Sequence, residues 1–262
     1  MAEEKELSLF SITDHDTIGG VLEVKKNSKE YSFKFLTGIE LSINYKNKKL
    51  EVLGYNIDVK RSSFGEKLKQ LQLEREHRIH LILKKLNNIG VDLTIADIET
   101  HTNLTESPGR LHIARTLVSK GYVSTISEAF DKYIGNGKPA YVMRKAIKPS
   151  EAIELIQNAG GIAVLPHPLV FESHNFERLK EILDDFVIWG MKGIEVYYDY
   201  QTMLPDLSAG HKNDGIEFLK RYCRKNDMLQ TGGSDYHGDK GFLGNVIIPR
   251  NVVVQLINYF ST

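Results

Sequence analysis

Leu-Ser-Leu-Phe-Ser-Ile-Thr-Asp-His-Asp-Thr, residues 7–17, shows the pattern from which we predict the fold. An apolar run typical of a buried strand ends in acidic and imidazole side chains, and a turn follows. Three later runs repeat the pattern and end at Glu40, at His167 and at Asp235-Tyr-His237. Side chains at the same ends of neighbouring parallel strands converge on one mouth, where a barrel-like α/β enzyme keeps its chemistry. The pattern therefore predicts a metal-dependent hydrolase.

The composition is that of a globular protein without a strong net charge. Of 262 residues 41% are hydrophobic, and 34 Lys and Arg balance 34 Asp and Glu, so there is no general attraction for nucleic acid or an anionic membrane. The single Cys223 excludes an internal disulfide and a zinc site of several cysteines, and it fits the cytoplasm, where we expect the protein. No apolar run approaches the roughly 20 residues of a membrane span, and the acidic N-terminus lacks a signal-peptide core.

Strand and helix patterns alternate along most of the chain. We predict strands at residues 7–13, 32–42, 49–57, 161–165, 193–197, 229–231 and 246–248. We predict helices at residues 64–88, 95–100, 111–119, 126–133, 150–158, 176–183, 214–225 and 252–260, with Ser150 as a helix cap. We therefore expect residues 1–63 and 147–262 to form an α/β metal-dependent domain, and residues 64–146 to form a helical insertion over its mouth.

Asp14-His15-Asp16 is the sharpest local signal, because three potential metal ligands stand in a row at a strand end. Side chains alternate in direction along a strand. His15 can therefore face the site while Asp14 or Asp16 orients it from behind. The alternative is an ordinary turn, since Asp and Thr are common turn and cap residues.

Other ligand-type side chains stand in specific settings. A buried Glu40 is costly unless it is paired or bound to a cation. His167 lies between two prolines that fix the backbone on either side of it. Asp235 and His237 can both reach one metal cluster, because flanking glycines permit a sharp turn. The alternatives are an exposed strand end, a core histidine and a flexible loop.

Two further carboxylates, Glu51 and Glu195, lie in predicted strands. Glu51 either faces solvent or is a ligand. Glu195 is a ligand, a base that acts from behind the ligands, or a salt-bridge partner. The remaining histidines lack convergent spacing, and we interpret them as surface or packing residues: His77, His80, His101, His174 and His211.

Arg110, His112, Lys138 and Tyr141 belong to the predicted insertion and supply cationic and hydrogen-bonding groups. Arg binds phosphate through two parallel hydrogen bonds, and Lys adds a point charge. These four residues are candidates for substrate binding, with ordinary solvated charge as the alternative.

Taken together, these motifs resemble the polymerase and histidinol phosphatase (PHP) family. The resemblance is carried by Ile12-Thr13-Asp14-His15-Asp16-Thr17, Gly38-Ile39-Glu40-Leu41-Ser42, Leu53-Gly54-Tyr55, His167-Pro168 and Gly233-Ser234-Asp235-Tyr236-His237-Gly238. The insertion runs 109–115 and 135–142 resemble one branch, the nucleoside 3',5'-bisphosphate phosphatases and related 5'-to-3' exoribonucleases. The likeness covers nearly the whole chain.

The resemblance implies a distorted (β/α)7 TIM-like barrel with up to three divalent metal ions, commonly Mn, Fe or Zn, at its C-terminal mouth. It assigns metal-ligand roles to His15, Glu40, His167, Asp235 and His237. Family members usually have a histidine where this chain has Glu51. Carboxylate can replace imidazole on these metals, so Glu51 becomes a predicted ligand.

Family members also open with a strand that ends in Asp-Leu-His-x-His, and this sequence shows no such strand before residue 7. In the family arrangement the first metal then keeps Glu40 and Asp235, and the third keeps His15 and His237. The second, on Glu40, His167 and Glu51, is best preserved. We therefore expect fewer metals than in the family, uneven occupancy and impaired activity.

These features predict a metal-dependent phosphoesterase that hydrolyses phosphomonoesters of nucleotides, 3',5'-bisphosphonucleotide-like, or acts on 5'-phosphorylated RNA ends. The candidate catalytic residues are His15, Asp235 and His237. The alternatives are an inert PHP-like metal-binding or scaffold module, an amidohydrolase-like barrel and a histidinol-phosphatase-like enzyme. We expect a small nucleotide or a short RNA 5' end as partner, no membrane and no obligate protein partner.

Overall fold

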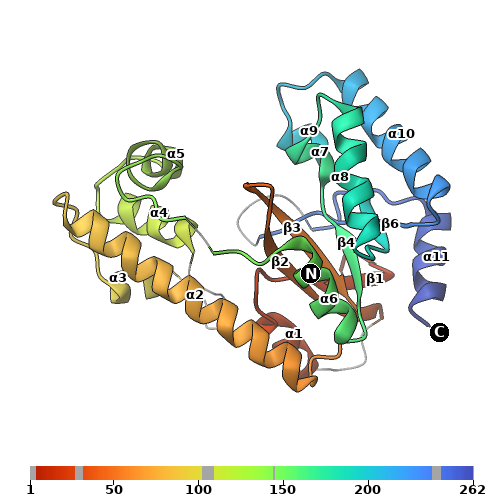
Figure 1. Cartoon of the computed structure of the whole chain (residues 1–262), viewed down its shortest axis with the longest axis horizontal. Helices are drawn as coiled ribbons and strands as arrows, with labels where there is room; N and C mark the ends of the chain where they lie inside the picture. The colour runs from red at the N-terminus through yellow and green to blue at the C-terminus, as the bar shows by residue number, and fades with distance from the viewer. Residues whose placement is uncertain (1–3, 27–31, 102–108, 144, 238–242, 262) are drawn as a thin grey trace.

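The computed structural model describes residues 4–26, 32–101, 109–143, 145–237 and 243–261. Its centre is a curled six-stranded sheet whose strands lie in sequence order (Figure 1). They are β1 (Leu9–Ile12), β2 (Lys34–Tyr45), β3 (Lys48–Tyr55), β4 (Ile162–Leu165), β5 (Gly193–Tyr197) and β6 (Leu229–Gly232). Gly238, which ends the predicted Gly-rich motif, lies outside the described residues.

The sheet is mixed rather than parallel throughout. β1 pairs with β2 in parallel, as do β4 with β5 and β5 with β6, whereas β3 is antiparallel to both of its neighbours. The chain reverses at Lys46 and Asn47, where φ is +48° and +67°. Two consecutive left-handed residues form a tight hairpin turn, which leaves no room for a crossover helix. A hairpin therefore replaces strand–helix alternation at β2–β3.

Amphipathic helices cover the outside of the sheet. They are α6 (Pro149–Asn158), α8 (Phe176–Ile188) and α10 (Ala209–Lys225), while α11 (Arg250–Tyr259) packs beside β6 (Figure 1). The buried side chains of α6, α8 and α10 join those of β2 to β5 in one hydrophobic core. Burial of this apolar surface fixes the strands whose ends carry the candidate site.

The long helix α2 (Ser62–Asn87) connects the sheet to a separate group of helices, which we call the helical region. The group comprises α3 (Ile95–Glu99), α4 (Arg110–Ser119), α5 (Ile126–Ala129) and the π-helical turn η1 (Phe130–Ile134). The first turns of α2 bury Phe64 and Leu68 in the core of the sheet. Its last turns bury Ile82 and Leu86 in a second core among these helices. In Figure 1, α2 (orange) runs from beside the sheet into the helical region.

Three short helices were not predicted: α1 (Gly19–Lys26), α7 (Pro168–Phe171) and α9 (Tyr200–Met203). None exceeds 8 residues, which is too short for a helical periodicity to stand out. Among the described helices, none combines the length and the apolar character that a membrane crossing requires.

Two local predictions are wrong. Ser150 is not a cap, because Lys148 is the N-cap of α6 and Pro149 opens the helix. Proline is favoured there because its missing N–H needs no partner in the first turn. Residues 246–248 form no strand. Ile247 is 89% exposed, while Ile248 packs against the apolar cluster of β6 and α11.

Candidate metal centre

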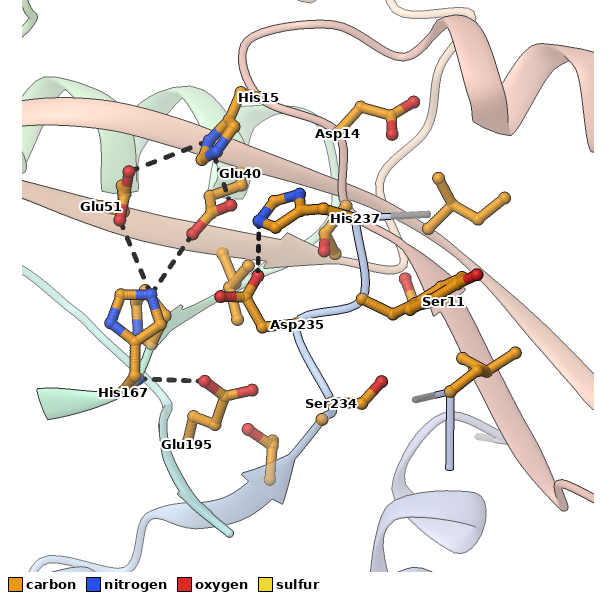
Figure 2. Close-up of a pocket in the computed structure, with 18 of the residues that line it drawn as sticks. Ser11, Asp14, His15, Glu40, Glu51, His167, Glu195, Ser234, Asp235 and His237 are labelled. Carbon is orange, nitrogen blue, oxygen red and sulfur yellow. Dashed lines mark hydrogen bonds and ion pairs between the residues drawn. The ribbon is translucent and has the colours of Figure 1, made fainter. Parts of the chain in front are cut away.

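Neighbouring strands direct His15, Glu40, Glu51 and His167 toward one point (Figure 2). Glu40 lies in β2, and the hairpin register pairs Glu51 of β3 with Ser42, two residues beyond Glu40. Residues two apart in a strand share a face, so both carboxylates project from the same side of the sheet. His15 follows β1 and forms an isolated bridge with Glu40, and His167 follows β4.

These four side chains form a closed circuit of contacts, which we call the ligand ring. His15 Nδ1 lies 3.1 Å from Glu40 Oε2 and 3.9 Å from Glu51 Oε1. His167 Nε2 lies 3.7 Å from Glu40 Oε1 and 3.6 Å from Glu51 Oε2. Ligand atoms bound at about 2.1 Å to one tetrahedral ion are about 3.4 Å apart. Three members of the ligand ring, His15, Glu40 and Glu51, each place one ligand atom within 4.8 Å of the other two, as a metal site requires.

The chemistry of the ligand ring also fits a divalent cation. Burial, followed by the charges of Glu51 and Asp235, raises the pKa of Glu40 well above its usual range, so a nearby cation would relieve an unfavourable anion. Burial lowers the pKa of His15, which favours the neutral imidazole that binds metals. His15 Nδ1 is buried and makes no hydrogen bond, although it lies 3.1 Å from Glu40.

Asp235 and His237 form a separate pair on the loop after β6. His237 Nε2 lies 3.3 Å from Asp235 Oδ1, and the Tyr198 hydroxyl donates to Asp235 Oδ2 at 2.9 Å. Burial alone would raise the pKa of Asp235, but the contacts with His237 and Tyr198 outweigh it and lower this pKa to about 2. The ring of His237 stacks on that of His15 with centroids 5.8 Å apart. The pair therefore borders the ligand ring.

Asp14 and Asp16, both predicted to orient His15, have different partners. Asp16 accepts a hydrogen bond from the backbone N–H of Ser42 at 2.9 Å and pairs with Arg75 at 2.6 Å. Asp14 Oδ2 accepts from the backbone N–H of Gly20 at 3.1 Å, in the first turn of α1. Asp16 therefore anchors the loop that carries His15, whereas the carboxylate of Asp14 serves as a cap for α1.

Glu195 supports His167 through its backbone rather than its ring. His167 has φ +31° and ψ +53° at the N-cap of α7, a left-handed conformation that is uncommon for residues other than glycine. Its N–H donates to Glu195 Oε2 at 3.0 Å. Glu195 is 4% exposed, and burial raises its pKa to about 8. Figure 2 shows Glu195 beside His167, outside the ligand ring.

A cleft of about 1180 Å³ opens over the ligand ring. Its lining includes the ligand ring, the loop after β6, and residues of α2 and α4. Arg110 and His112, two of the predicted substrate-binding residues, line this cleft. Three further arginines, Arg75, Arg78 and Arg115, do so as well. The helices α2 and α4 therefore give the cleft a cationic wall near its acidic floor.

The other two predicted substrate-binding residues lie elsewhere. Lys138 and Tyr141 are not among the lining residues of the cleft. Lys138 is exposed, whereas the ring of Tyr141 lies 6.0 Å from the guanidinium of Arg110, which also lies 5.3 Å from the ring of Phe130. Tyr141 and Phe130 therefore position Arg110 by cation–π contacts.

Sequence reasoning missed Tyr198 and the arginines of α2. Tyr198 follows β5 at a strand end, the same setting as the ligands, but a search for Asp, Glu and His passes over it. Arg75 and Arg78 are three residues apart and so share a helix face, and two arginines on the inward side of a helix were the available signal.

Comparisons with known proteins identify relatives of this chain. The chain is 30% identical over 243 residues to a 5'-3' exoribonuclease of Haemophilus influenzae, covering 90% of this chain and 82% of that one. The chain belongs to the PHP-like phosphoesterase family. It is also 27% identical over 230 residues to a 3',5'-nucleoside bisphosphate phosphatase of Chromobacterium violaceum, covering 88% and 77% of the two chains. No family model matches this PHP-like chain.

The fold has a solved counterpart. An amidohydrolase from Chromobacterium violaceum, with bound sulfate and no metal, superimposes with a TM-score of 0.80 at 24% identity, covering 98% of this chain and 88% of that one. This likeness shows the fold alone. A shared fold hosts many reactions, so the reaction of this PHP-like protein has to be argued from its site.

Proposed function

We propose that the chain is a metal-dependent phosphoesterase that hydrolyses phosphomonoesters of nucleotides, 3',5'-bisphosphonucleotide-like, or acts at 5'-phosphorylated RNA ends. The observation that carries the proposal is the ligand ring at the floor of a cleft that arginines also line. A cation site beside arginines suits a substrate with more than one phosphate. The names of the two relatives, an exoribonuclease and a nucleoside bisphosphate phosphatase, support this substrate class.

His15, Glu40, Glu51 and His167 would hold one divalent ion, and Asp235 would contribute to a neighbouring, weaker site that leaves the His237 imidazole free for proton transfer. The mixture of oxygen and nitrogen ligands suits Mn, Fe or Zn. A divalent ion in the ligand ring supplies a Lewis acid that lowers the pKa of bound water and neutralises phosphate charge. We propose that the ligand ring is occupied first.

The chain's own residues would then manage the proton and the geometry. His237 would donate a proton to the leaving oxygen, because its half-exposed imidazole faces the cleft and is held by Asp235. His15 would act by holding the ion, since an imidazole bound to metal is not free to act as a base. Glu195 would keep His167 in its left-handed conformation.

Residues 64–146 would form a cap that recognises the phosphate that is not cleaved. Residues of α2 and α4 line the cleft, and the second hydrophobic core lets these helices pack as a unit. Arg110, held between Phe130 and Tyr141, would bind the phosphate with its planar guanidinium, and His112 would add a polar contact.

The sheet would be six strands of a (β/α)7 barrel. Among the described residues β1 and β6 each have one neighbouring strand, and both line the cleft. The hydroxyls of Ser11 in β1 and Thr231 in β6 are buried without a hydrogen-bond partner. A further strand between them would pair both edges. A variant with an added Asp-Leu-His-x-His strand should bind more Mn²⁺ per chain, and unchanged stoichiometry would contradict this assignment.

We propose a cytoplasmic protein that acts on its small substrate without an obligate protein partner. Cys223 is buried, and burial raises the pKa of its thiol to about 12. A buried thiol of this kind is unreactive, which suits a reducing compartment and gives no route to a disulfide-linked partner.

Release of phosphate or of mononucleotides with added Mn²⁺ tests the function. We expect turnover of a nucleoside 3',5'-bisphosphate or of a 5'-phosphorylated oligoribonucleotide, faster than that of p-nitrophenyl phosphate. Glu40→Gln is the matched control and should abolish it. Turnover of none of these substrates, with Mn²⁺ bound, would identify an inert metal-binding module, and preference for histidinol phosphate would move the chain to another branch.

A further inference from the structure

The middle of α2 contacts the loop that carries His15. Arg75 Nη1 pairs with Asp16 Oδ2 at 2.6 Å and also donates to the backbone carbonyl of His15 at 3.2 Å. The Asp16 side chain is 1% exposed and that of Arg75 is 13% exposed. A short, buried, charge-assisted contact of this kind is stronger and more directional than a surface ion pair.

The loop needs this anchor because its backbone is in a costly conformation. Asp16 has φ +54°, and a residue other than glycine adopts this region only when surrounding contacts hold it there. The N–H of Asp16 donates to the carbonyl of Glu40 at 2.9 Å, and its carboxylate accepts from Ser42. Of these contacts of Asp16, the one with Arg75 is the only contact with a cation. It is also the only one of them made by a residue of a helix.

The same arginine lies between the two hydrophobic cores. The part of α2 that precedes Arg75 buries Phe64 and Leu68 in the core of the sheet. The part that follows Arg75 buries Ile79 and Leu86 in the core of the helical region. A Cβ atom built on Gly109, at the N-cap of α4, would lie 3.2 Å from Arg75 Nη2. The guanidinium therefore touches the loop of His15 and adjoins the start of the helix that carries Arg110.

We propose that Arg75 is a positioning residue for His15, and that through it the seating of the cap is coupled to the geometry of the ligand ring. This inference rests on one part of the proposed function, the binding of a metal ion by the ligand ring. Arg75 acts through Asp16 and the His15 carbonyl, so its removal frees the loop and lets the His15 imidazole leave its place beside Glu40.

The first test replaces Arg75 in the full chain and measures Mn²⁺ affinity by EPR titration. Arg75→Met should weaken Mn²⁺ binding by about 10- to 100-fold, the usual effect of losing a group that orients a ligand. Lys69→Met, which removes an exposed cation from the same helix, should leave the affinity unchanged. Arg75→Lys should rescue it in part, because Lys keeps the charge without the fork that bonds two acceptors. An Arg75→Met protein with reduced Tm but wild-type Mn²⁺ affinity would overturn the proposal.

A double-mutant cycle tests the route. If Arg75 acts through Asp16, the Arg75→Met/Asp16→Asn protein should bind Mn²⁺ within about twofold of the weaker single variant. Additive losses would contradict the coupling. The NMR signals of the His15 imidazole in the metal-free protein provide a readout that needs no metal. They should shift in Arg75→Met and not in Lys69→Met. If the wild type binds no Mn²⁺, the proposed function fails, while these signals still decide whether Arg75 positions His15.

Discussion

The ligand ring and the Asp235/His237 pair border the same cleft, but the protein holds them in different ways. Glu40 and Glu51 lie in paired strands, so backbone hydrogen bonds fix their positions. Asp235 and His237 lie on a loop, and Asp235 has φ +48°. Side-chain contacts with Tyr198 and with each other hold this pair. Backbone pairing fixes the two carboxylates of the ligand ring, whereas side-chain contacts hold the Asp235/His237 pair.

The two carboxylates at the centre of each group show the difference in their pKa values. Burial raises the pKa of Glu40, and its neighbours Glu51 and Asp235 raise it further. Asp235 is more exposed than Glu40, and its contacts with His237 and Tyr198 lower its pKa to about 2. Opposite shifts within one cleft mark groups with different tasks. The Glu40 carboxyl would ionise only beside a cation. The Asp235 carboxyl is already held in its ionised form by its contacts with His237 and Tyr198.

The largest expected effect comes from neutralising the ligand ring. Glu40→Gln should lower Mn²⁺ affinity and kcat/KM by more than about 100-fold, because loss of a ligand exceeds the effect typical of a group that only orients one. The same change should raise the Tm of the metal-free protein, since folding without metal must protonate the Glu40 carboxyl, whose pKa burial raises, and the amide needs no proton. Titration of Mn²⁺ and thermal unfolding in EDTA measure the two effects. A lower Tm in EDTA would mean that Glu40 is stabilised without metal.

The second-largest expected effect comes from the Asp235/His237 pair, and it separates the role of this pair from that of the ligand ring. Asp235→Asn/His237→Gln should reduce kcat by about 100-fold, the usual contribution of a proton-transfer group. The tightest Mn²⁺ site should keep its affinity, because the variant leaves the four side chains of the ligand ring unchanged. Stoichiometry from equilibrium dialysis should fall only in the weaker class of sites. Loss of the tight site in this variant would show that the two groups form one centre.

The sequence predicted the members of both groups because each signal is local. An apolar run that ends in Asp, Glu or His can be read within ten residues or so. The turn at residues 45–47 fixes the hairpin that pairs Glu51 with Ser42, on the same face as Glu40. The sequence left Glu51 open between solvent and ligand, and only its resemblance to the family favoured a ligand. The strand register places Glu51 on the same face as Glu40, because a slip of one residue would turn Glu51 away.

Contacts between distant segments could not be predicted. The contact of Arg75 with Asp16 spans 59 positions and depends on how α2 crosses the sheet. Lys138 and Tyr141 were chosen for their chemistry, but packing decides which side chains of the helical region reach the cleft, and it selected Arg110 and His112. Periodicity shows which side of a helix is apolar. It does not show against which strand that helix packs.

A smaller effect concerns pH and the metal-free protein. Burial raises the pKa of Glu195 from 4.5 to about 8, so between these values the folded state binds more protons than the unfolded state. Stability then falls as pH rises through this window. His15, whose pKa is lowered from 6.5, acts in the opposite direction. In EDTA, the wild type should lose stability relative to Glu195→Gln between pH 5 and 8, by a few kcal/mol. A constant difference in the free energy of unfolding would contradict a raised pKa.

The smallest effect compares two cations of the cap. Arg110 lines the cleft, whereas Lys138 is exposed outside it. Arg110→Met should raise the KM for a nucleoside 3',5'-bisphosphate by about 10-fold, the equivalent of one charged hydrogen bond, and should change the kinetics of p-nitrophenyl phosphate little. Lys138→Met should change either KM by less than about threefold, as expected for a solvated charge. Equal losses in both variants would mean that the substrate extends beyond the cleft, along the surface of the cap, as a longer RNA chain would.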